Sequence, residues 1–221
     1  MIKTPNDTTF SKKSQYELQE WGSSDWKVIQ KKLKQKRVCL DIGAHIGLTS
    51  IRYSKNFEQV HCFEPIMCEY LEENTKELSN ITIHKVAVTD KKSTLKIYPN
   101  QFNSGSNVIE SEETSKLIST RWKKLNSRHF GTIPMDVEGI SVDSLNIKNV
   151  DCIKIDVEGY NIPVLKGMIN TLKENSPVIQ VETHPENTEV EITTNKILTE
   201  LGYKRYHKSN GTPPDWFYYK D

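Results

Sequence analysis

Four short apolar runs, each followed by a stretch of different character, constrain the fold of this 221-residue chain more than any other feature. The runs are too short for helices and do not alternate with polar residues, which is typical of strands buried on both faces of a sheet. They span Val38–Leu40, Val60–Phe63, Cys152–Ile155 and Val178–Val181. Ile81–Val88 is a further strand candidate.

The segments between these runs have helical patterns. We expect helices over Ile46–Ser54 and Ile66–Leu78, and one after Pro163 that places Val164, Leu165, Met168, Ile169 and Leu172 on one face. Repeated alternation of strand and helix predicts an α/β domain with a mostly parallel sheet covered by helices on both faces.

The C-terminal end has a different pattern. A helix that carries Val190, Ile197 and Leu201 is expected to end at Gly202. Tyr203–His207 and Trp216–Tyr219 then flank a turn over residues 211–214, which predicts a terminal hairpin and an antiparallel last strand.

Two regions lie outside this alternation. Residues 1–36 are expected to form an N-terminal helical extension, with one or two helices over residues 11–36, and residues 37–221 the main domain. Residues 103–132 are polar and of mixed charge, and long insertions of this kind often cover active sites. We therefore predict that residues 103–132 form a substrate lid.

Charge and apolar content exclude some function classes. The 30 Lys and Arg residues balance 29 acidic residues, so no global field attracts nucleic acid or an anionic membrane. Met1–Phe10 has no apolar signal core, and no window approaches the roughly 18 apolar residues of a membrane span. The four cysteines lack zinc-binding spacing. We expect a soluble cytoplasmic protein with reduced cysteines.

The first apolar run leads into a glycine turn that contains Asp41, Gly43 and Gly47. A dinucleotide site requires an uninterrupted glycine pattern around a pyrophosphate, whereas Ala44 and His45 interrupt the pattern here and an acid ends the strand. A carboxylate at that position would repel pyrophosphate and suit a cationic ligand such as S-adenosylmethionine. The alternative is a tight turn that only packs.

Glu64 ends the second apolar run, where an acidic side chain can accept hydrogen bonds from both hydroxyls of a ribose. A cap for the following helix is the alternative, because acids favour helix N-termini. The coincidence of Glu64 with the glycine turn favours a nucleoside.

Several motifs in order resemble those of FkbM-type methyltransferases. They are Asp41–Gly47, Phe63-Glu64-Pro65, Ala87–Asp90, Ser141–Leu145, Ile153–Tyr160, Val164–Gly167 and Glu182-x-His184, within residues 38–208. The resemblance implies a Rossmann-like class I methyltransferase fold with a mostly parallel seven-stranded sheet, an antiparallel C-terminal strand and helices on both faces. It also implies O-methylation, often of sugars or polyketide-like alcohols.

The resemblance further implies a binding site for S-adenosylmethionine. Its methionine part would lie among Asp41, Gly43, Ala44 and Gly47, its ribose on Glu64, and its adenine beside Ala87 and Val88, with His45 and Pro65 in the same turns. His45 stands where many members have Asn, and Asn161 where many have Glu. Either departure could alter contacts to the donor or the substrate.

Asp-Val-Glu-Gly occurs twice, and the copy that supplies Asp156 and Glu158 follows a buried strand. Glu182 and His184 follow the next strand, so all four side chains are expected at the edge where ligands of open α/β sheets bind. We hypothesise that His184 or Asp156 is the base that deprotonates a hydroxyl. The first copy, residues 136–139, is expected to be structural.

Other functions remain open at this stage. The four side chains could alternatively bind Mg²⁺, although no metal site is assigned. A nucleotide-cofactor oxidoreductase would also have a glycine turn followed by an acid after the next strand. A non-catalytic module that only binds the donor would also retain Glu64. An RNA methyltransferase would use Arg121, Trp122, Lys123, Lys124 and Arg128. The expected partner is a small molecule or glycan with a hydroxyl, without nucleic acid or membrane.

Overall fold

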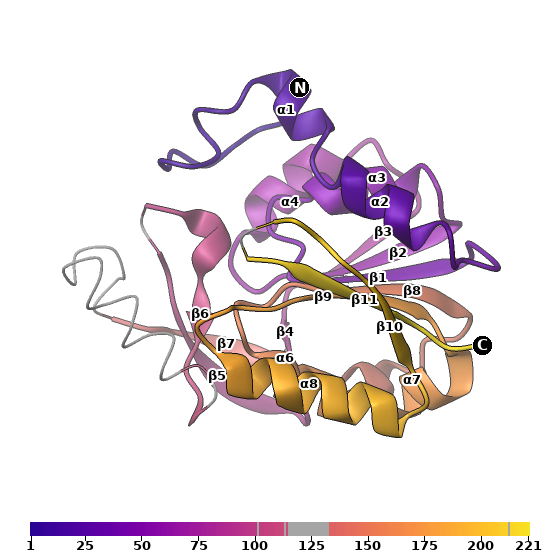
Figure 1. The fold of residues 1–221 in the computed structure, drawn as a ribbon. Helices are drawn as coiled ribbons and strands as arrows, with labels where there is room; N and C mark the ends of the chain where they lie inside the picture. Colours follow the sequence, from indigo (N-terminus) through magenta and orange to yellow (C-terminus); the bar gives the residue numbers. More distant parts are fainter. Residues whose placement is uncertain (101, 113, 115–132, 212) are drawn as a thin grey trace.

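The computed structural model describes residues 1–100, 102–112, 114, 133–211 and 213–221 (Figure 1). A seven-stranded sheet with the order β10-β11-β9-β8-β1-β2-β3 lies at its centre. The strands are β1 (Val38–Ile42), β2 (Gln59–Phe63), β3 (Ile81–His84), β8 (Val150–Ile155), β9 (Val178–Glu182), β10 (Lys204–Lys208) and β11 (Asp215–Tyr219). The four apolar runs are thus confirmed as strands, and β3, β2, β1, β8 and β9 pair in parallel. The strand β11 is antiparallel to both β9 and β10.

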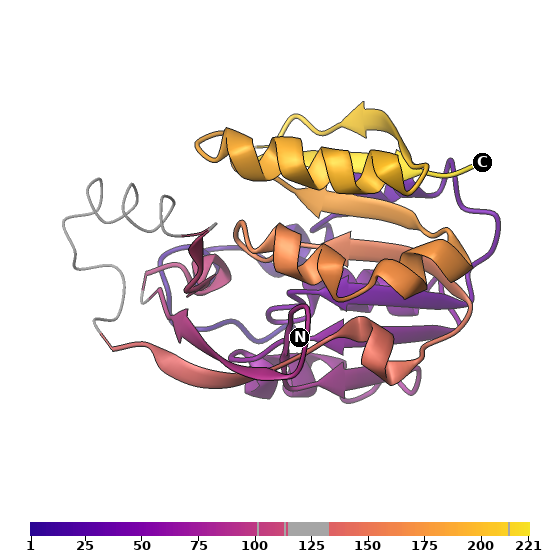
Figure 2. The same ribbon diagram turned by 90° about the horizontal axis from the view of Figure 1, so that it is seen from below.

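Helices cover both faces of this sheet (Figures 1 and 2). One face carries α2 (Ser23–Ile29), α3 (Leu48–Ser54) and α4 (Cys68–Thr75), and the other carries α6 (Asn161–Lys166), α7 (Ile169–Asn175) and α8 (Thr188–Glu200). Because successive strand residues point to opposite faces, Cys39 packs into one core cluster and Leu40 into the other. None of the described helices is long and apolar enough to cross a membrane.

Two predicted elements are wrong in detail. The single helix expected after Pro163 is two helices, α6 and α7, because the chain bends at Gly167. A Cβ at Gly167 would lie 1.9 Å from the carbonyl oxygen of Thr89, so this helix end touches the backbone of another segment. The single strand expected over Ile81–Val88 is likewise divided between two sheets.

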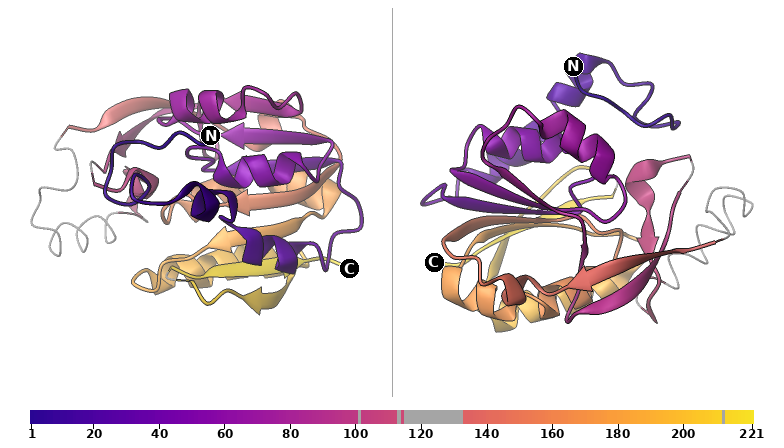
Figure 3. Two further views of the ribbon diagram at one scale, coloured as in Figure 1. Left: turned by 90° about the horizontal axis from the view of Figure 1, so that it is seen from above. Right: turned by 180° about the vertical axis from the view of Figure 1, so that it is seen from behind.

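A second, four-stranded sheet with the order β4-β7-β5-β6 lies beside the main one (Figure 3). It consists of β4 (Ala87–Val88), β5 (Ser93–Tyr98), β6 (Val108–Ile109) and β7 (Met135–Ile140). The sequence analysis missed it because two strands have only two residues and the others are largely exposed. The first Asp-Val-Glu-Gly copy lies in β7.

The N-terminal segment and α1 (Gln15–Gln19) extend across the molecule towards this second sheet (Figure 1). The backbone N–H of Thr8 donates to the carbonyl of Phe102 at 2.9 Å. The short 3₁₀ helices are η1 (Ser104–Ser106) and η2 (Val142–Leu145). Of the predicted lid, residues 115–132 lie outside the described residues, and they include the basic residues of the RNA hypothesis.

Candidate active site

A cavity of about 460 Å³ lies at the carboxyl ends of the parallel strands, between the two sheets and the N-terminal segment. It is lined by most of the residues that the sequence analysis selected. These are Gly43, Ala44, His45, Glu64, Pro65, Ala87, Val88, Asp156, Glu158 and Glu182. Asp41, Gly47 and His184 do not line it, and each has a different role.

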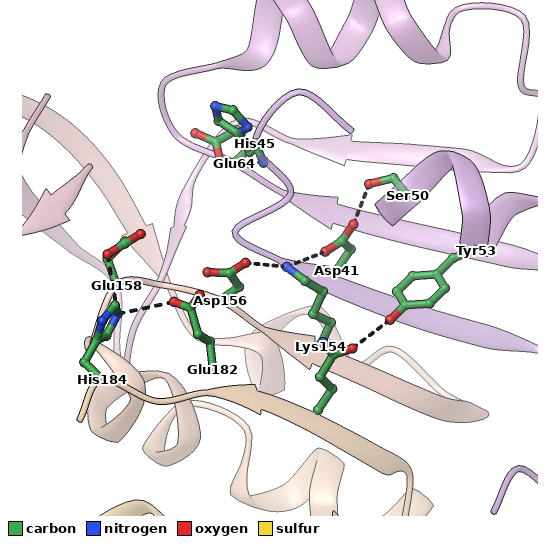
Figure 4. A network of polar contacts seen from close by, with 11 residues as sticks. Asp41, His45, Ser50, Tyr53, Glu64, Lys154, Asp156, Glu158, Glu182 and His184 are labelled. Carbon is green, nitrogen blue, oxygen red and sulfur yellow. Dashed lines mark hydrogen bonds and ion pairs between the residues drawn. The ribbon is translucent and has the colours of Figure 1, made fainter. Parts of the chain in front are cut away.

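Asp41 lies behind the cavity wall and is fully buried. Its carboxylate accepts a hydrogen bond from the Ser50 hydroxyl at 2.6 Å and lies 3.8 Å from the ammonium of Lys154 (Figure 4). Burial raises the pKa of Asp41, and the Lys154 charge opposes that rise. Asp41 does not line the cavity, whereas Lys154, which lies beside it, does.

Lys154 connects the buried carboxylate to the cavity (Figure 4). Its ammonium donates to Asp156 at 2.9 Å. Burial would lower the pKa of Lys154, but Asp156 and Asp41 together raise it. Burial would likewise raise the pKa of Asp156, but the charge and hydrogen bond of Lys154, together with Glu182 and His184, lower it overall. Lys154 and Asp156 are therefore both ionised at neutral pH.

The glycine turn allows β1 and β8 to approach each other closely. Gly43 has φ of 79°, and a Cβ there would lie 1.8 Å from the carbonyl oxygen of Asp156. The N–H groups of Gly43 and Ala44 both donate to the Phe63 carbonyl and so are not directed at a ligand. Gly47 precedes α3 as its N-cap, lies close to Leu71 and does not line the cavity.

Glu64 lines the cavity and holds the turn that precedes α4, but it does not cap the helix itself, which starts at Cys68 without a side-chain cap. One carboxylate oxygen accepts from the N–H groups of Ile66 and Met67, and the other accepts from that of His45 at 2.9 Å. Burial raises the pKa of Glu64, and these three hydrogen bonds oppose the rise. The bonds fix the carboxylate at the cavity wall, where its oxygens retain lone pairs.

His45 joins the cavity to the N-terminal segment. Its Nε2 lies 2.9 Å from the hydroxyl of Ser104, which donates to Asp7 at 2.6 Å. Because the serine proton is directed at Asp7, His45 is the donor in its own contact. The Phe10 ring lies 4.7 Å from the His45 ring. Burial lowers the pKa of His45 to about 4, so this side chain is neutral at physiological pH.

Two acidic side chains meet a buried histidine at the other end of the cavity (Figure 4). The Nε2 atom of His184 lies 3.2 Å from Glu182 and 3.4 Å from Glu158. Burial, followed by the charges of Asp156 and Glu158, raises the pKa of Glu182 well above its ordinary value, and Glu182 donates a hydrogen bond to Asp156. One potential ligand atom from each of Glu158, Glu182 and His184 lies within 4.8 Å of the others, which is compact enough for a metal ion.

The cavity residues that were not predicted from the sequence include four polar or charged ones that the site depends on: Asp25 of α2, Lys154 of β8, Gln180 of β9 and Asp215 of β11. Lys154 carries a detectable signal, because it is a charged residue inside an otherwise apolar strand. Asp25 and Asp215 have no such signal, since each lies in a polar or mixed segment and reaches the cavity only through tertiary packing.

Comparison with known proteins places this geometry in a family. The model for the methyltransferase FkbM domain matches residues 41–208. The comparison with curated proteins gave no match.

Solved structures share the fold at low sequence identity. A methyltransferase FkbM from Methylobacillus flagellatus is 16% identical with a TM-score of 0.54, and the match covers 87% of this chain and 50% of that one. This chain thus spans half the length of that protein. A putative rRNA-methylase from Clostridium thermocellum is 8% identical with a TM-score of 0.52, and the match covers 90% of this chain and 93% of the other.

Proposed function

Because the chain belongs to the methyltransferase FkbM domain family, we propose that it transfers the methyl group of S-adenosylmethionine to a hydroxyl of a sugar or another small alcohol. The observation that carries this proposal is the set of residues that line the cavity at the carboxyl ends of the strands. Glu64 and the glycine turn line one half, and Asp156 with Glu182 lines the other. A nucleoside donor and an acceptor could therefore bind side by side.

The donor half suits a nucleoside in its shape and chemistry. Glu64 presents a fixed carboxylate for the ribose hydroxyls, and Ala87 and Val88 supply apolar surface for an adenine. The turn at Gly43 and Ala44 would lie against the methionine part of the donor. Asp41 acts from behind this half by holding Lys154 in place.

Methyl transfer is an in-line displacement, so the site must align oxygen, methyl carbon and sulfur. As the C–O bond forms and the C–S bond breaks, positive charge moves from sulfur to the acceptor oxygen. Asp156 is ionised and lines the cavity, so we propose that it takes the hydroxyl proton as attack proceeds. His184, the other candidate base, lies outside the cavity wall and orients Glu158 and Glu182 instead.

Single-turnover methyl transfer with labelled S-adenosylmethionine tests the assignment of the base. We expect Asp156→Asn to lower the rate by roughly 10²- to 10⁴-fold, the usual contribution of a general base, with little change in donor affinity. Asp136→Asn is the matched control, because Asp136 occupies the equivalent position of the first Asp-Val-Glu-Gly copy and pairs with Lys96 on the exposed second sheet. Equal rates for wild type and Asp156→Asn would reject Asp156 as the base.

Metal removal gives a separate prediction. His184 already contacts both glutamates, and Lys154 already balances Asp156, so the proposed mechanism needs no cation at Glu158, Glu182 and His184. We expect methyl transfer to continue unchanged after exhaustive dialysis against EDTA. Loss of transfer that Mg²⁺ restores would instead support the metal-dependent alternative.

A further inference from the structure

The half of the cavity over β8, β9 and β11 is lined by many more acidic than basic side chains. Its carboxyl groups come from Asp25, Asp156, Glu158, Glu182 and Asp215. Among the described lining residues, Lys154 is the only lysine or arginine, and the one lining histidine, His45, is neutral. This imbalance lies at the cavity wall, where groups are partly desolvated and charges interact strongly.

Two of these acidic residues have no described ion-pair partner. The Lys154 ammonium is already engaged by Asp156 at 2.9 Å and Asp41 at 3.8 Å, and His184 contacts the two glutamates. Asp25 and Asp215 make no ion pair with any residue in the described part of the chain. They are therefore the carboxyls that a bound cation could neutralise.

Asp25 and Asp215 are held together by one amide. Both carboxylates accept a hydrogen bond from the side-chain amide of Gln180. The Oε1 atom of the same amide accepts from the Tyr53 hydroxyl at 3.3 Å. Burial and then the charges of Asp156 and Asp25 raise the pKa of Asp215 to about 7. The two side chains come from α2 and β11 and form a pair that we call the aspartate clamp.

The donor does not supply enough positive charge to balance this wall. S-adenosylmethionine carries a sulfonium, an ammonium and a carboxylate, which gives one net positive charge. Glu182 is protonated, as its hydrogen bond to Asp156 requires, and the four other carboxyls on this half of the cavity still outnumber its one lysine, so Asp25 and Asp215 keep no cation of their own when the donor is bound. A phosphorylated or carboxylated acceptor would add to the repulsion, whereas an ammonium group would relieve it.

We propose that the acceptor carries an ammonium group as well as the hydroxyl that is methylated, as an amino sugar or an amino alcohol does. The ammonium binds at the aspartate clamp, and the hydroxyl faces Asp156. This inference rests on the proposed function and specifies its acceptor class. The clamp then acts as the determinant that selects cationic over neutral and anionic alcohols.

Binding of matched sugar probes to the protein saturated with S-adenosylhomocysteine tests the acceptor class. The probes are oligosaccharides of equal length made of glucosamine, glucose or glucuronic acid, titrated by calorimetry in EDTA. We expect the glucosamine probe to bind at least about tenfold more tightly than the glucose probe, with the difference falling at high salt. The glucuronic acid probe should bind most weakly.

Variants of the clamp attribute this preference to the two aspartates. Asp25→Asn and Asp215→Asn should each weaken glucosamine binding about fivefold or more, while glucose binding and S-adenosylhomocysteine binding stay unchanged. Asp136→Asn, which removes the same charge from the exposed second sheet, should leave all three unchanged.

Equal or tighter binding of the glucose or glucuronic acid probe would overturn the inference. The same holds if no glucosamine probe binds at millimolar concentration, or if the preference survives in both clamp variants. These results would leave the proposed function intact, because S-adenosylhomocysteine is already bound. Failure of the wild-type protein to bind S-adenosylhomocysteine would instead reject the proposed function itself.

Discussion

At the scale of single residues, the site is defined by how a small number of buried charges are balanced. Lys154 lies between Asp41 and Asp156, and its charge helps to lower the pKa of Asp156 and opposes the rise that burial causes in the pKa of Asp41. Burial raises the pKa of both Glu182 and Asp215. The pKa values of neighbouring carboxyls in one cavity are thus shifted in opposite directions, which is a feature of functional sites.

The raised pKa of Asp215 predicts how stability depends on pH. Its pKa is about 7 in the folded protein against 3.8 as the ordinary value, so the folded state binds more protons between these limits. The free energy of unfolding therefore falls as pH rises through this range. Asp215→Asn should abolish this fall in the free energy of unfolding. In the wild type the fall amounts to at most about 1.4 kcal/mol for each pH unit between the two pKa values. Urea unfolding of the wild type and Asp215→Asn at pH 5 and pH 8 measures the difference.

The expected result is that Asp215→Asn is more stable than the wild type at pH 8 and gains less, or nothing, at pH 5. Asp136→Asn serves again as the control, since it replaces an exposed aspartate. A stability difference between Asp215→Asn and the wild type that is the same at both pH values would contradict the raised pKa.

The cavity residues that could be predicted best are those whose side chains follow a buried strand directly. Glu64, Asp156 and Glu182 could be predicted because parallel strands end at the same edge of the sheet. Asp41 and His184 were selected by the same rule, yet their side chains point away from the cavity. The direction of a side chain at a strand end depends on local backbone geometry, which the pattern of apolar residues does not encode.

At the scale of elements, the close contact between the turn after β1 and the start of the loop after β8 shapes the site. Asp156 N–H donates to the Ile42 carbonyl at 3.0 Å, and Gly43 lies directly against the Asp156 carbonyl. This contact brings Asp156 beside the glycine turn. The two halves of the cavity are therefore adjacent because Gly43 has no side chain.

Replacement of Gly43 measures this contact. We expect Gly43→Ala to destabilise the protein by roughly 3 kcal/mol or more, because it combines a left-handed φ with a severe backbone clash. Gly22→Ala is the matched control: its φ is 69°, but its nearest neighbour to a new Cβ is 3.9 Å away. Gly22→Ala should therefore cost only about 1–2 kcal/mol.

Thermal or urea denaturation of both variants provides the comparison. Equal losses for Gly43→Ala and Gly22→Ala would show that backbone conformation accounts for the whole effect and that the close approach at Asp156 does not constrain the fold.

The helices and strands that could be predicted from the sequence are those with the most continuous apolar pattern. The central strands β1, β2, β8 and β9 are mostly buried, so apolar residues predominate in their sequences. The strands of the second sheet are short or partly exposed and give no such run. The break between α6 and α7 depends on contact with Thr89, which is distant in the sequence.

At the scale of the whole molecule, the cavity exists only because three distant parts of the chain meet. The parallel strands supply its floor, the second sheet and η1 supply one wall, and the N-terminal segment contributes Phe10 and Asp25. Asp7 bonds both the N–H and the hydroxyl of Ser104, which connects two of these parts. The N-terminal segment is therefore a component of the site.

The central claim is that the family's methyl donor binds in this cavity against Glu64, and calorimetric titration with S-adenosylhomocysteine tests it most directly. We predict saturable one-to-one binding by the wild type and at least about tenfold weaker binding by Glu64→Gln, since a hydrogen bond to a charged group is worth roughly 1.5–3 kcal/mol. Glu72→Gln, on the exposed side of α4, should bind like the wild type. No binding by the wild type, or equal binding by Glu64→Gln, would contradict the account.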